Sequence, residues 1–425
     1  MTSYKKPFPF KPLIKRFIKK VNFITQFGLY SLFAGNAFSQ QVISLDLAIQ
    51  KAVQNNLAIR SERLQSNFKR SLVRASANIP QANLNAELGQ FNSIYRDNRF
   101  GIQQSIEFPT VYSYQKALAT KQWEGSLMNV RLKEIELIKR VELVYLELMI
   151  ALEKQKVLQQ ADSLYSEFIK KSSLRLEKGD ANILEKVTAE SQAKRIKQQL
   201  IFLQQTILEL TIHLQFLLNT DEILVPDTSS MFYKLRGQID TAGYLAHPSL
   251  GIIENQKTMA NIEKKIERSK LLPDFMAGYS STTIRGIGAD DIFYSSSQRF
   301  NSAQFGIGIP LFFGSQKSKI NASKIQQEIA ANQLLEKAAE MRGQLKSLIQ
   351  KYKICNDRLD YYVQTGLPNS ETIIETANLQ FSMGQIGYLD WVLLMNQSFE
   401  IKNEFTDALR EFNQTVLEIN YITSK

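Results

Sequence analysis

The strongest constraint on this sequence is an internal duplication, because it requires a fold built from two similar halves. LRLEKGDANILEKV in the first half matches LQFSMGQIGYLDWV in the second, with Gly179 opposite Gly384 at an offset of 205 residues. Nearer the start, LDLAIQKAVQNNLAIRSERLQ matches AGYLAHPSLGIIENQ, with Asn56 opposite His247 at an offset of 191 residues. The larger later offset predicts an insertion in the second half, and the Gly-, Ser- and Asp-rich segment TTIRGIGADDIFYSSSQR has the composition of such a loop.

Each half is predicted to run helix, strand, strand, very long helix, tight turn, helix. No proline lies between Pro109 and Pro226, and no glycine lies between Gly125 and the tight turn. A single helix is therefore predicted from about Tyr112 to about Lys178, roughly 100 Å long at 1.5 Å per residue. Its counterpart in the second half has apolar residues at alternating spacings of three and four, which predicts a coiled-coil seam. That seam comprises Leu345, Leu348, Tyr352, Cys355, Leu359 and Tyr362.

Four shorter segments alternate apolar and polar residues and are predicted to be strands, at about 83–93, 99–108, 274–284 and 302–312. Their lengths suit tilted strands that cross a bilayer. The apolar set comprises Leu84, Leu88, Phe100, Ile102, Ile106, Phe108, Phe275, Tyr279, Phe305, Ile307 and Ile309. The polar set between them comprises Asn83, Asn85, Glu87, Gln103, Ser105 and Glu107.

Alternation alone fits a soluble sheet with one buried face equally well. The length of the helices decides against that alternative, because helices of roughly 100 Å extend far beyond a four-stranded sheet and cannot serve as its cover. In lipid, a four-stranded sheet would leave two edges of unpaired backbone groups, so only a closed barrel is tolerated. Closure shared by three copies gives twelve strands, wide enough for a water-filled lumen, whereas two copies give eight. We therefore expect the apolar set to face lipid and the polar set to face a pore.

The first residues resemble a targeting signal. Seven basic residues and no acidic residue precede the apolar segment VNFITQFGLYSLFAGNAFSQ, which is the order of a secretory signal peptide, here predicted at 1–39. Without this leader the chain has 45 basic and 41 acidic residues, an excess too small to indicate nucleic acid as a partner. The rest is predicted to comprise a first repeat at 40–219, a connector at 220–240 that crosses the outside of the helices, and a second repeat at 241–425.

The duplicated plan, the two glycine turns and the prolines before the strands in ANIPQANL and KLLPDFMAG resemble the TolC-like outer-membrane efflux protein family over residues 44–421. The resemblance implies a fold that is mainly α with transmembrane β: a homotrimer with a twelve-stranded barrel in the cell outer membrane and a long α-helical tunnel through the periplasm. It also implies a passive export duct without enzyme activity or cofactor, docked on a periplasmic adaptor protein and an inner-membrane efflux pump of the RND type. FPTVYSYQKALATKQ resembles the heavy-metal (CusC/CzcC-like) subgroup.

The turns between the long helices are predicted to form the ends of this tunnel, with Gly179, Gly384 and Gly387 as turn residues. Four further residues are candidates for the periplasmic entrance: Glu185, Asp390, Tyr388 and Trp391. The two acids lie six residues after equivalent glycines, so a trimer would bring six carboxylates together and favour cations. Equally, both are ordinary first-turn acids that the helix dipole stabilises. The family's charged gate positions are held here by Ile386 and Leu393, so an ion-paired gate is not expected, and Tyr388 or Trp391 could close the end sterically or by docking.

No catalytic or metal site is predicted. His213 and His247 have no Cys or acidic cluster at metal-ligand spacing around them, and no phosphate-binding glycine loop is present. Two other functions remain open at this point. A periplasmic adaptor is also exported and helical, but such proteins normally have one hairpin where this chain has two. A soluble coiled-coil scaffold would give the alternating strands no purpose.

Overall fold

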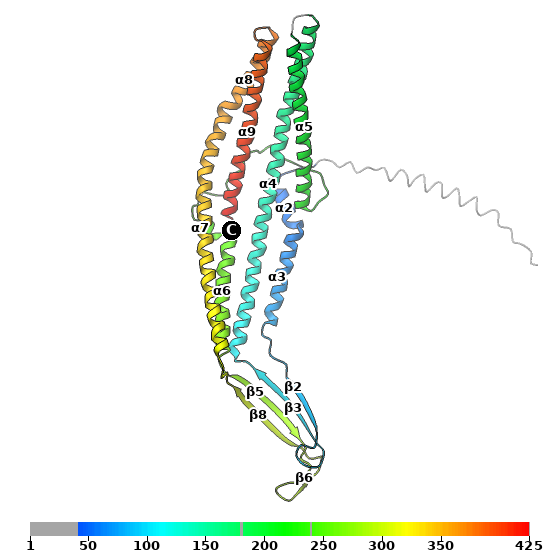
Figure 1. The fold of residues 1–425 in the computed structure, drawn as a ribbon, viewed down its shortest axis with the longest axis vertical. Helices are drawn as coiled ribbons and strands as arrows, with labels where there is room; N and C mark the ends of the chain where they lie inside the picture. Colours follow the sequence, from blue (N-terminus) through cyan, green and yellow to red (C-terminus); the bar gives the residue numbers. More distant parts are fainter. Residues whose placement is uncertain (1–40, 179–181, 239, 425) are drawn as a thin grey trace, which may run out of the picture.

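A computed structural model of the chain describes residues 41–178, 182–238 and 240–424. The predicted leader at 1–39 and Gly179 lie outside these described residues. The molecule is strongly elongated: long helices lie side by side over most of its length, and a four-stranded sheet continues from one end of them (Figure 1). The chain reversals between the long helices lie at the opposite end (Figure 1).

The long helices form two hairpins of matching length, one from each half of the sequence. α4 covers 69 residues, Pro109–Glu177, so it is about 100 Å long. Its counterpart starts 205 residues later and is divided into α7 (Gly314–Tyr361), a π-helical turn and α8 (Leu367–Ser382). The returning helices, α5 (Ile183–Leu218) and α9 (Tyr388–Ile422), are related by the same offset. The predicted duplication and the length of the first long helix are therefore confirmed.

The second long helix is interrupted where the sequence contains Pro368. Proline has no N–H to donate and its ring crowds the carbonyl group one turn earlier, so a regular α-helix cannot pass through it. The chain accommodates the proline with the π-helical turn Tyr362–Gly366. Glycine suits the end of this turn, because a Cβ atom on Gly366 would lie 2.9 Å from Cδ1 of Tyr362.

Shorter helices support the hairpins on the side of the sheet. In the first half these are α2 (Leu45–Asn55) and α3 (Leu57–Ala75), and in the second half η1 (Gly243–Ala246) and α6 (Pro248–Ser269). The two residues that the duplication aligns, Asn56 and His247, have the same role. Asn56 Oδ1 accepts the N–H groups of residues 58 and 59, and His247 Nδ1 accepts that of residue 249, so each caps the helix that follows.

The sheet has the order β2-β3-β5-β8, and all neighbouring strands are antiparallel. Two of its strands come from each half of the sequence, as expected. The predicted insertion loop contains a small hairpin of β6 (Gly286–Ile287) and β7 (Phe293–Tyr294). The four strands are β2 (Asn83–Gly89), β3 (Asp97–Ile106), β5 (Asp274–Thr282) and β8 (Phe300–Gly308).

The strands end earlier than the alternation predicts. β8 was expected to continue to residue 312, but Pro310 cannot donate a ladder hydrogen bond and the strand ends at Gly308. Ile309 consequently lies just outside the strand. Glu107 and Phe108 likewise follow β3, and Phe108 is the residue before the first turn of α4.

The connector between the halves is held by two asparagines of α9. The connector contains the short strand β4 (Leu224–Pro226), which pairs in parallel with β1 (Gln41–Ile43). Farther along, Asn413 accepts a backbone N–H at 2.9 Å and donates to a backbone carbonyl at 2.7 Å, and Asn420 repeats this pattern at 2.9 and 3.2 Å. The connector groups that they bind belong to residues 231–236. Seven residues separate the two asparagines, so both lie on one face of the helix.

Replacing one of these asparagines should loosen the connector. In Asn413→Leu, one backbone N–H and one carbonyl lose their partners in a buried place, and each unsatisfied group costs about 1–3 kcal/mol. We expect faster proteolytic cleavage of the connector near residues 231–236. The control is Asn403→Leu on the same helix, whose side chain makes no hydrogen bond within the described part of the chain. Equal cleavage of the two variants would show that the hydrogen bonds of Asn413 do not hold the connector in place.

Candidate functional site

The strand register gathers the apolar residues of all four strands on one face of the sheet. A representative row across the sheet is Leu84, Ile102, Tyr279 and Ala303. Within the strands this face has no Asp, Glu, Lys or Arg residue. The predicted apolar residues that lie within strands are all on it. Ile106 is half-buried, and the others are 40–85% exposed: Leu84, Leu88, Phe100, Ile102, Phe275, Tyr279, Phe305 and Ile307. The helices of the same copy therefore do not cover this face.

The opposite face of the sheet is polar. It presents Asn83, Asn85, Glu87, Gln103 and Ser105, which are the predicted polar residues within the strands. It also carries Arg99, whose Nη1 lies 2.9 Å from Oε2 of Glu87. The outermost strands, β2 and β8, each pair on one side only among the described residues. The sheet thus has one apolar face without charges, one polar face with charges, and two open edges.

The turn between α8 and α9 has the backbone that its glycines permit. Gly384 has a φ of 71°, in the left-handed region where a side chain would be strained, and it reverses the chain. Gly387 is the residue before α9, and its N–H donates to Oδ2 of Asp390 at 3.3 Å. Asp390 therefore acts as a first-turn acid of its own helix. Glu185 is the equivalent first-turn acid of α5, and its Oε2 is buried without a hydrogen-bond partner among the described residues.

Tyr388 and Trp391 are placed differently from our expectation that they close the tunnel end. They are only 4% and 2% exposed, in the core between the two hairpins. Trp391 stacks on Phe168 of α4, with ring centroids 4.4 Å apart and an angle of 16° between the planes. Its Nε1 donates to Oδ1 of Asn378 at 2.8 Å. Because these rings pack inside one copy, they fasten the hairpins together instead of lining an opening. We define the aromatic cluster as Tyr165, Phe168, Phe381, Tyr388 and Trp391.

Two leucines that the sequence analysis did not select are conspicuous at the hairpin ends. Leu184 and Leu389 are the second residues of α5 and α9, related by the offset of 205, and they are 67% and 75% exposed. Leu393, at one of the expected gate positions, is also exposed, one turn after Leu389. The signal in the sequence was a leucine at equivalent positions of both repeats. Both hairpin ends therefore present apolar side chains to their surroundings.

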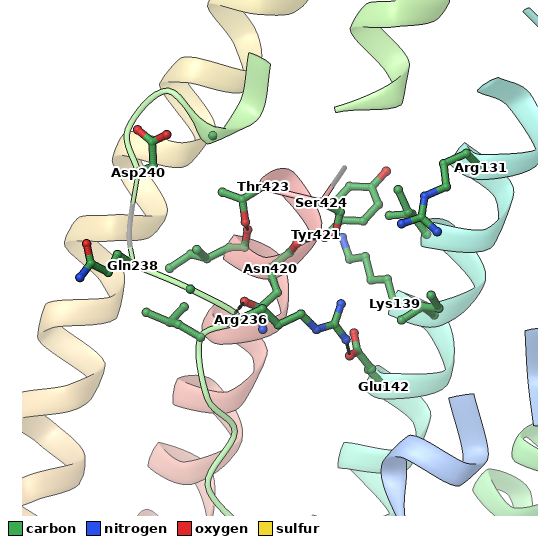
Figure 2. Close-up of a pocket in the computed structure, with 16 residues that line it drawn as sticks. Arg131, Lys139, Glu142, Arg236, Gln238, Asp240, Asn420, Tyr421, Thr423 and Ser424 are labelled. Carbon is green, nitrogen blue, oxygen red and sulfur yellow. Dashed lines mark hydrogen bonds and ion pairs between the residues drawn. The ribbon is translucent and has the colours of Figure 1, made fainter. Parts of the chain in front are cut away.

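A cavity of about 450 Å³ lies where the connector crosses α4 and α9 (Figure 2). Arg236 of the connector forms an ion pair with Glu142 of α4, whose side chain is 5% exposed. Lys139 on the same helix pairs with Glu418 of α9 at 2.8 Å. Because these two cations already have carboxylate partners, the cavity is best explained as a joint that fixes the connector.

The joint should give the protein a pH-dependent stability. Burial raises the pKa of Glu142 from 4.5 to about 7, although the adjacent Arg236 lowers it. A raised carboxyl pKa means that the folded state holds the proton more tightly, so stability is highest at low pH and falls between about pH 4.5 and 7. This contribution amounts to about 3 kcal/mol at most, and Glu142→Gln should remove it. The measurement is the melting temperature against pH, with Glu418→Gln, which removes the ion-pair partner of Lys139, as a control. An unchanged profile in Glu142→Gln would contradict the assignment.

No family model and no curated protein matches the chain. Solved structures do match it over most of its length. CusC is 16% identical with a TM-score of 0.75, and the match covers 93% of this chain and 95% of that one. The open state of the outer-membrane channel MtrE of Neisseria gonorrhoeae is 15% identical, with a TM-score of 0.73 and coverages of 89% and 88%. The outer-membrane protein VceC of Vibrio cholerae is 13% identical, with a TM-score of 0.71 and coverages of 89% and 96%. The chain therefore has the fold of TolC-like outer-membrane channels, mainly helical with four strands in each copy.

Proposed function

We propose that the chain is the outer-membrane channel of a tripartite efflux system and works as a passive duct. The observation that carries this proposal is the sheet, which exposes an apolar face without charges on one side and a polar face on the other. Such a sheet has a favourable environment only where one face meets hydrocarbon and the other meets water. The strands then cross the outer membrane, and the long helices extend into the periplasm.

The open edges of the sheet support a homotrimer. Unpaired N–H and C=O groups in lipid cost several kcal/mol each, so β8 of one copy must pair with β2 of the next until the barrel is closed. Three copies give twelve strands and an aqueous lumen. The outer surface of α5 supports the same assembly. Several large apolar side chains are exposed on this helix, namely Ile201, Phe202, Leu208, Ile212 and Phe216.

α5 also has the length and apolar composition of a membrane-spanning helix, with only 11% of the apolar window buried in the single copy. We propose that a neighbouring copy covers this surface, because α5 forms a hairpin with the part of α4 that lies away from the sheet (Figure 1). The helices of three copies would then close a tunnel that continues the barrel.

The organisation of the chain follows from this assignment. The leader at 1–39 would direct export, and residues 40–219 and 241–425 would form the two repeats on either side of the connector at 220–240. The duct would need no cofactor or enzyme activity, since the partner pump supplies the energy. Outer-membrane fractionation tests the proposal: we expect detergent-solubilised trimers from the outer membrane. A monodisperse monomer that stays in solution without detergent would contradict it.

The hairpin ends support docking on a periplasmic adaptor protein, which would link the duct to an inner-membrane pump of the RND type. Leu184 and Leu389 offer two exposed apolar contacts per copy at the second residue of each helix. Aspartate is favourable near a helix N-terminus, so replacing the leucines with aspartate should leave the helices intact.

The double variant Leu184→Asp with Leu389→Asp should therefore assemble as trimers but fail to support efflux. Losing two buried apolar contacts weakens adaptor binding by about 3–6 kcal/mol per copy. The measurement is growth of a deletion strain that carries each variant, in the presence of the metal or compound to which the deletion makes it sensitive. The control is Gln385→Asp, which adds a charge to the exposed α8–α9 turn without removing an apolar side chain. Normal efflux in the double variant would exclude these leucines as the docking contact.

For the cargo, we propose the heavy-metal cations suggested by FPTVYSYQKALATKQ, with the fold similarity to CusC in support. A wide duct needs no resident ligand site. Among the described residues, no group of three or more His, Cys, Asp or Glu side chains is placed to hold a metal ion. Growth of a deletion strain tests the cargo: sensitivity to copper, zinc or cobalt supports it. Sensitivity to organic compounds alone would contradict it and leave the channel function intact.

A further inference from the structure

Arg299 occupies an unusual position at the edge of the apolar face. It immediately precedes β8, and this strand begins at the end of the sheet away from the helices (Figure 1). All the partners of Arg299 belong to the apolar face. Its Nε donates to Oγ of Ser281 and its Nη2 to the carbonyl of the same residue, both at 2.8 Å. Its Nη1 donates to Oδ1 of Asn98 at 2.8 Å. The guanidinium carbon lies 5.2 Å from the ring centroid of Phe100. The side chain is therefore held in one place and is still exposed.

The charge of Arg299 is not neutralised within the described part of the chain. Its three acceptors are uncharged, and no carboxylate there lies within ion-pair distance. Arg99, on the opposite face of the sheet, differs because it pairs with Glu87 at 2.9 Å. A guanidinium group has five N–H donors, so Arg299 retains two that these contacts do not use. A fixed cation with spare donors therefore lies beside an apolar surface.

The surroundings of Arg299 indicate the ligand. Between Arg299 and the helices, the same face carries the apolar rows of the sheet, which suit acyl chains. The uncharged Asn301, which pairs with Ser281, lies beside Arg299. A molecule that fits this surface has a long apolar part and an anionic end. Guanidinium donors match phosphate oxygens in geometry, and a cation that is already held in place loses little entropy on binding.

We propose that Arg299 binds the phosphate group of an outer-leaflet lipid, one in each copy. This inference rests on the proposed channel function, which puts the apolar face in the bilayer and the Arg299 end of the sheet on the outer side. The lipid phosphate supplies the missing negative charge, and the acyl chains of the same lipid cover the apolar rows of the sheet. The channel is thereby fixed at a defined depth in the membrane.

The experiment measures lipid retention by purified trimers in native mass spectrometry. The probes are phosphatidic acid and diacylglycerol with identical acyl chains, which differ only in the phosphate. We expect the wild-type protein to prefer phosphatidic acid and Arg299→Gln to reduce its affinity by about tenfold or more, the equivalent of one charge-assisted hydrogen bond. The matched control is Arg99→Gln, on the polar face, which should retain the wild-type preference.

Two results would overturn the inference while the channel function stands. Membrane-inserted Arg299→Gln trimers with an unchanged lipid preference would show that Arg299 only braces the strands, even if their melting temperature falls. Complete displacement of phosphatidic acid by millimolar inorganic phosphate would assign the position to a soluble anion. Failure of the wild-type protein to insert into liposomes would instead overturn the channel function itself.

Discussion

Ile102→Lys should almost abolish assembly in the outer membrane, whereas Gln103→Lys in the next position should assemble normally. Ile102 lies in the middle of β3 on the face without charges, and Gln103 lies on the polar face. A lysine that faces lipid near the bilayer midplane costs about 2–4 kcal/mol, and a trimer incurs this cost three times. A lysine in an aqueous lumen remains hydrated and costs little.

The measurement is the amount of folded trimer in the outer-membrane fraction, read by its resistance to dissociation in detergent before heating. The two variants add the same charge to the same strand, so differences in expression or export are matched. Equal assembly of both variants would show that the faces of the sheet do not separate lipid from water. Loss of both would also contradict the assignment, because the position that faces water should tolerate a lysine.

Trp391→Ala should destabilise the joint between the hairpins by about 3–5 kcal/mol, which is typical for removing a buried aromatic ring. The ring is 2% exposed, stacks on Phe168 and donates a hydrogen bond to Asn378. Its loss leaves a cavity between α4 and α9 close to the hairpin ends. The ends should then separate more often, because the aromatic cluster is part of the core in which α4, α5, α8 and α9 meet.

Hydrogen exchange of the segments around residues 161–168 and 391–399 measures this effect locally. The control is Leu389→Ala two residues away, which is 75% exposed and should change stability by less than about 0.5 kcal/mol. Similar exchange in the two variants would contradict the role of the aromatic cluster. The same experiment also distinguishes an internal fastening from an entrance lining, since a residue that lines an opening would leave exchange unchanged.

The parts of the fold that the sequence predicted are those governed by local periodicity. The offset of 205 residues correctly aligned the starts of α4 with α7 and of α5 with α9. The alternation correctly separated the two faces of each strand, because side chains in a strand must alternate. The predicted strand ends were less accurate. β8 ends at Gly308 because Pro310 has no backbone N–H to donate to the sheet, and the alternation of apolar and polar residues does not reveal this.

The parts that could not be predicted depend on contacts between distant segments. Trp391 was expected at the tunnel entrance because it follows a turn, but its partner Phe168 lies in the other half of the sequence. The two asparagines of α9 are polar residues at buried helix positions, and only the folded connector shows which backbone groups they bind. The role of Arg299 likewise could not be predicted, because only the pairing of the strands shows that its hydrogen-bond acceptors lie on the apolar face.

The central claim is that one face of the sheet meets lipid and the other meets water. Spin labels in reconstituted trimers test it directly, in a Cys355→Ser background because that cysteine is the only one in the chain. Labels at Ile102→Cys and Phe305→Cys should collide with oxygen dissolved in the bilayer, and labels at Gln103→Cys and Gln304→Cys with a water-soluble nickel chelate. Equal access of the chelate to all four positions would contradict the claim, as would labels at 102 and 305 that neither reagent reaches.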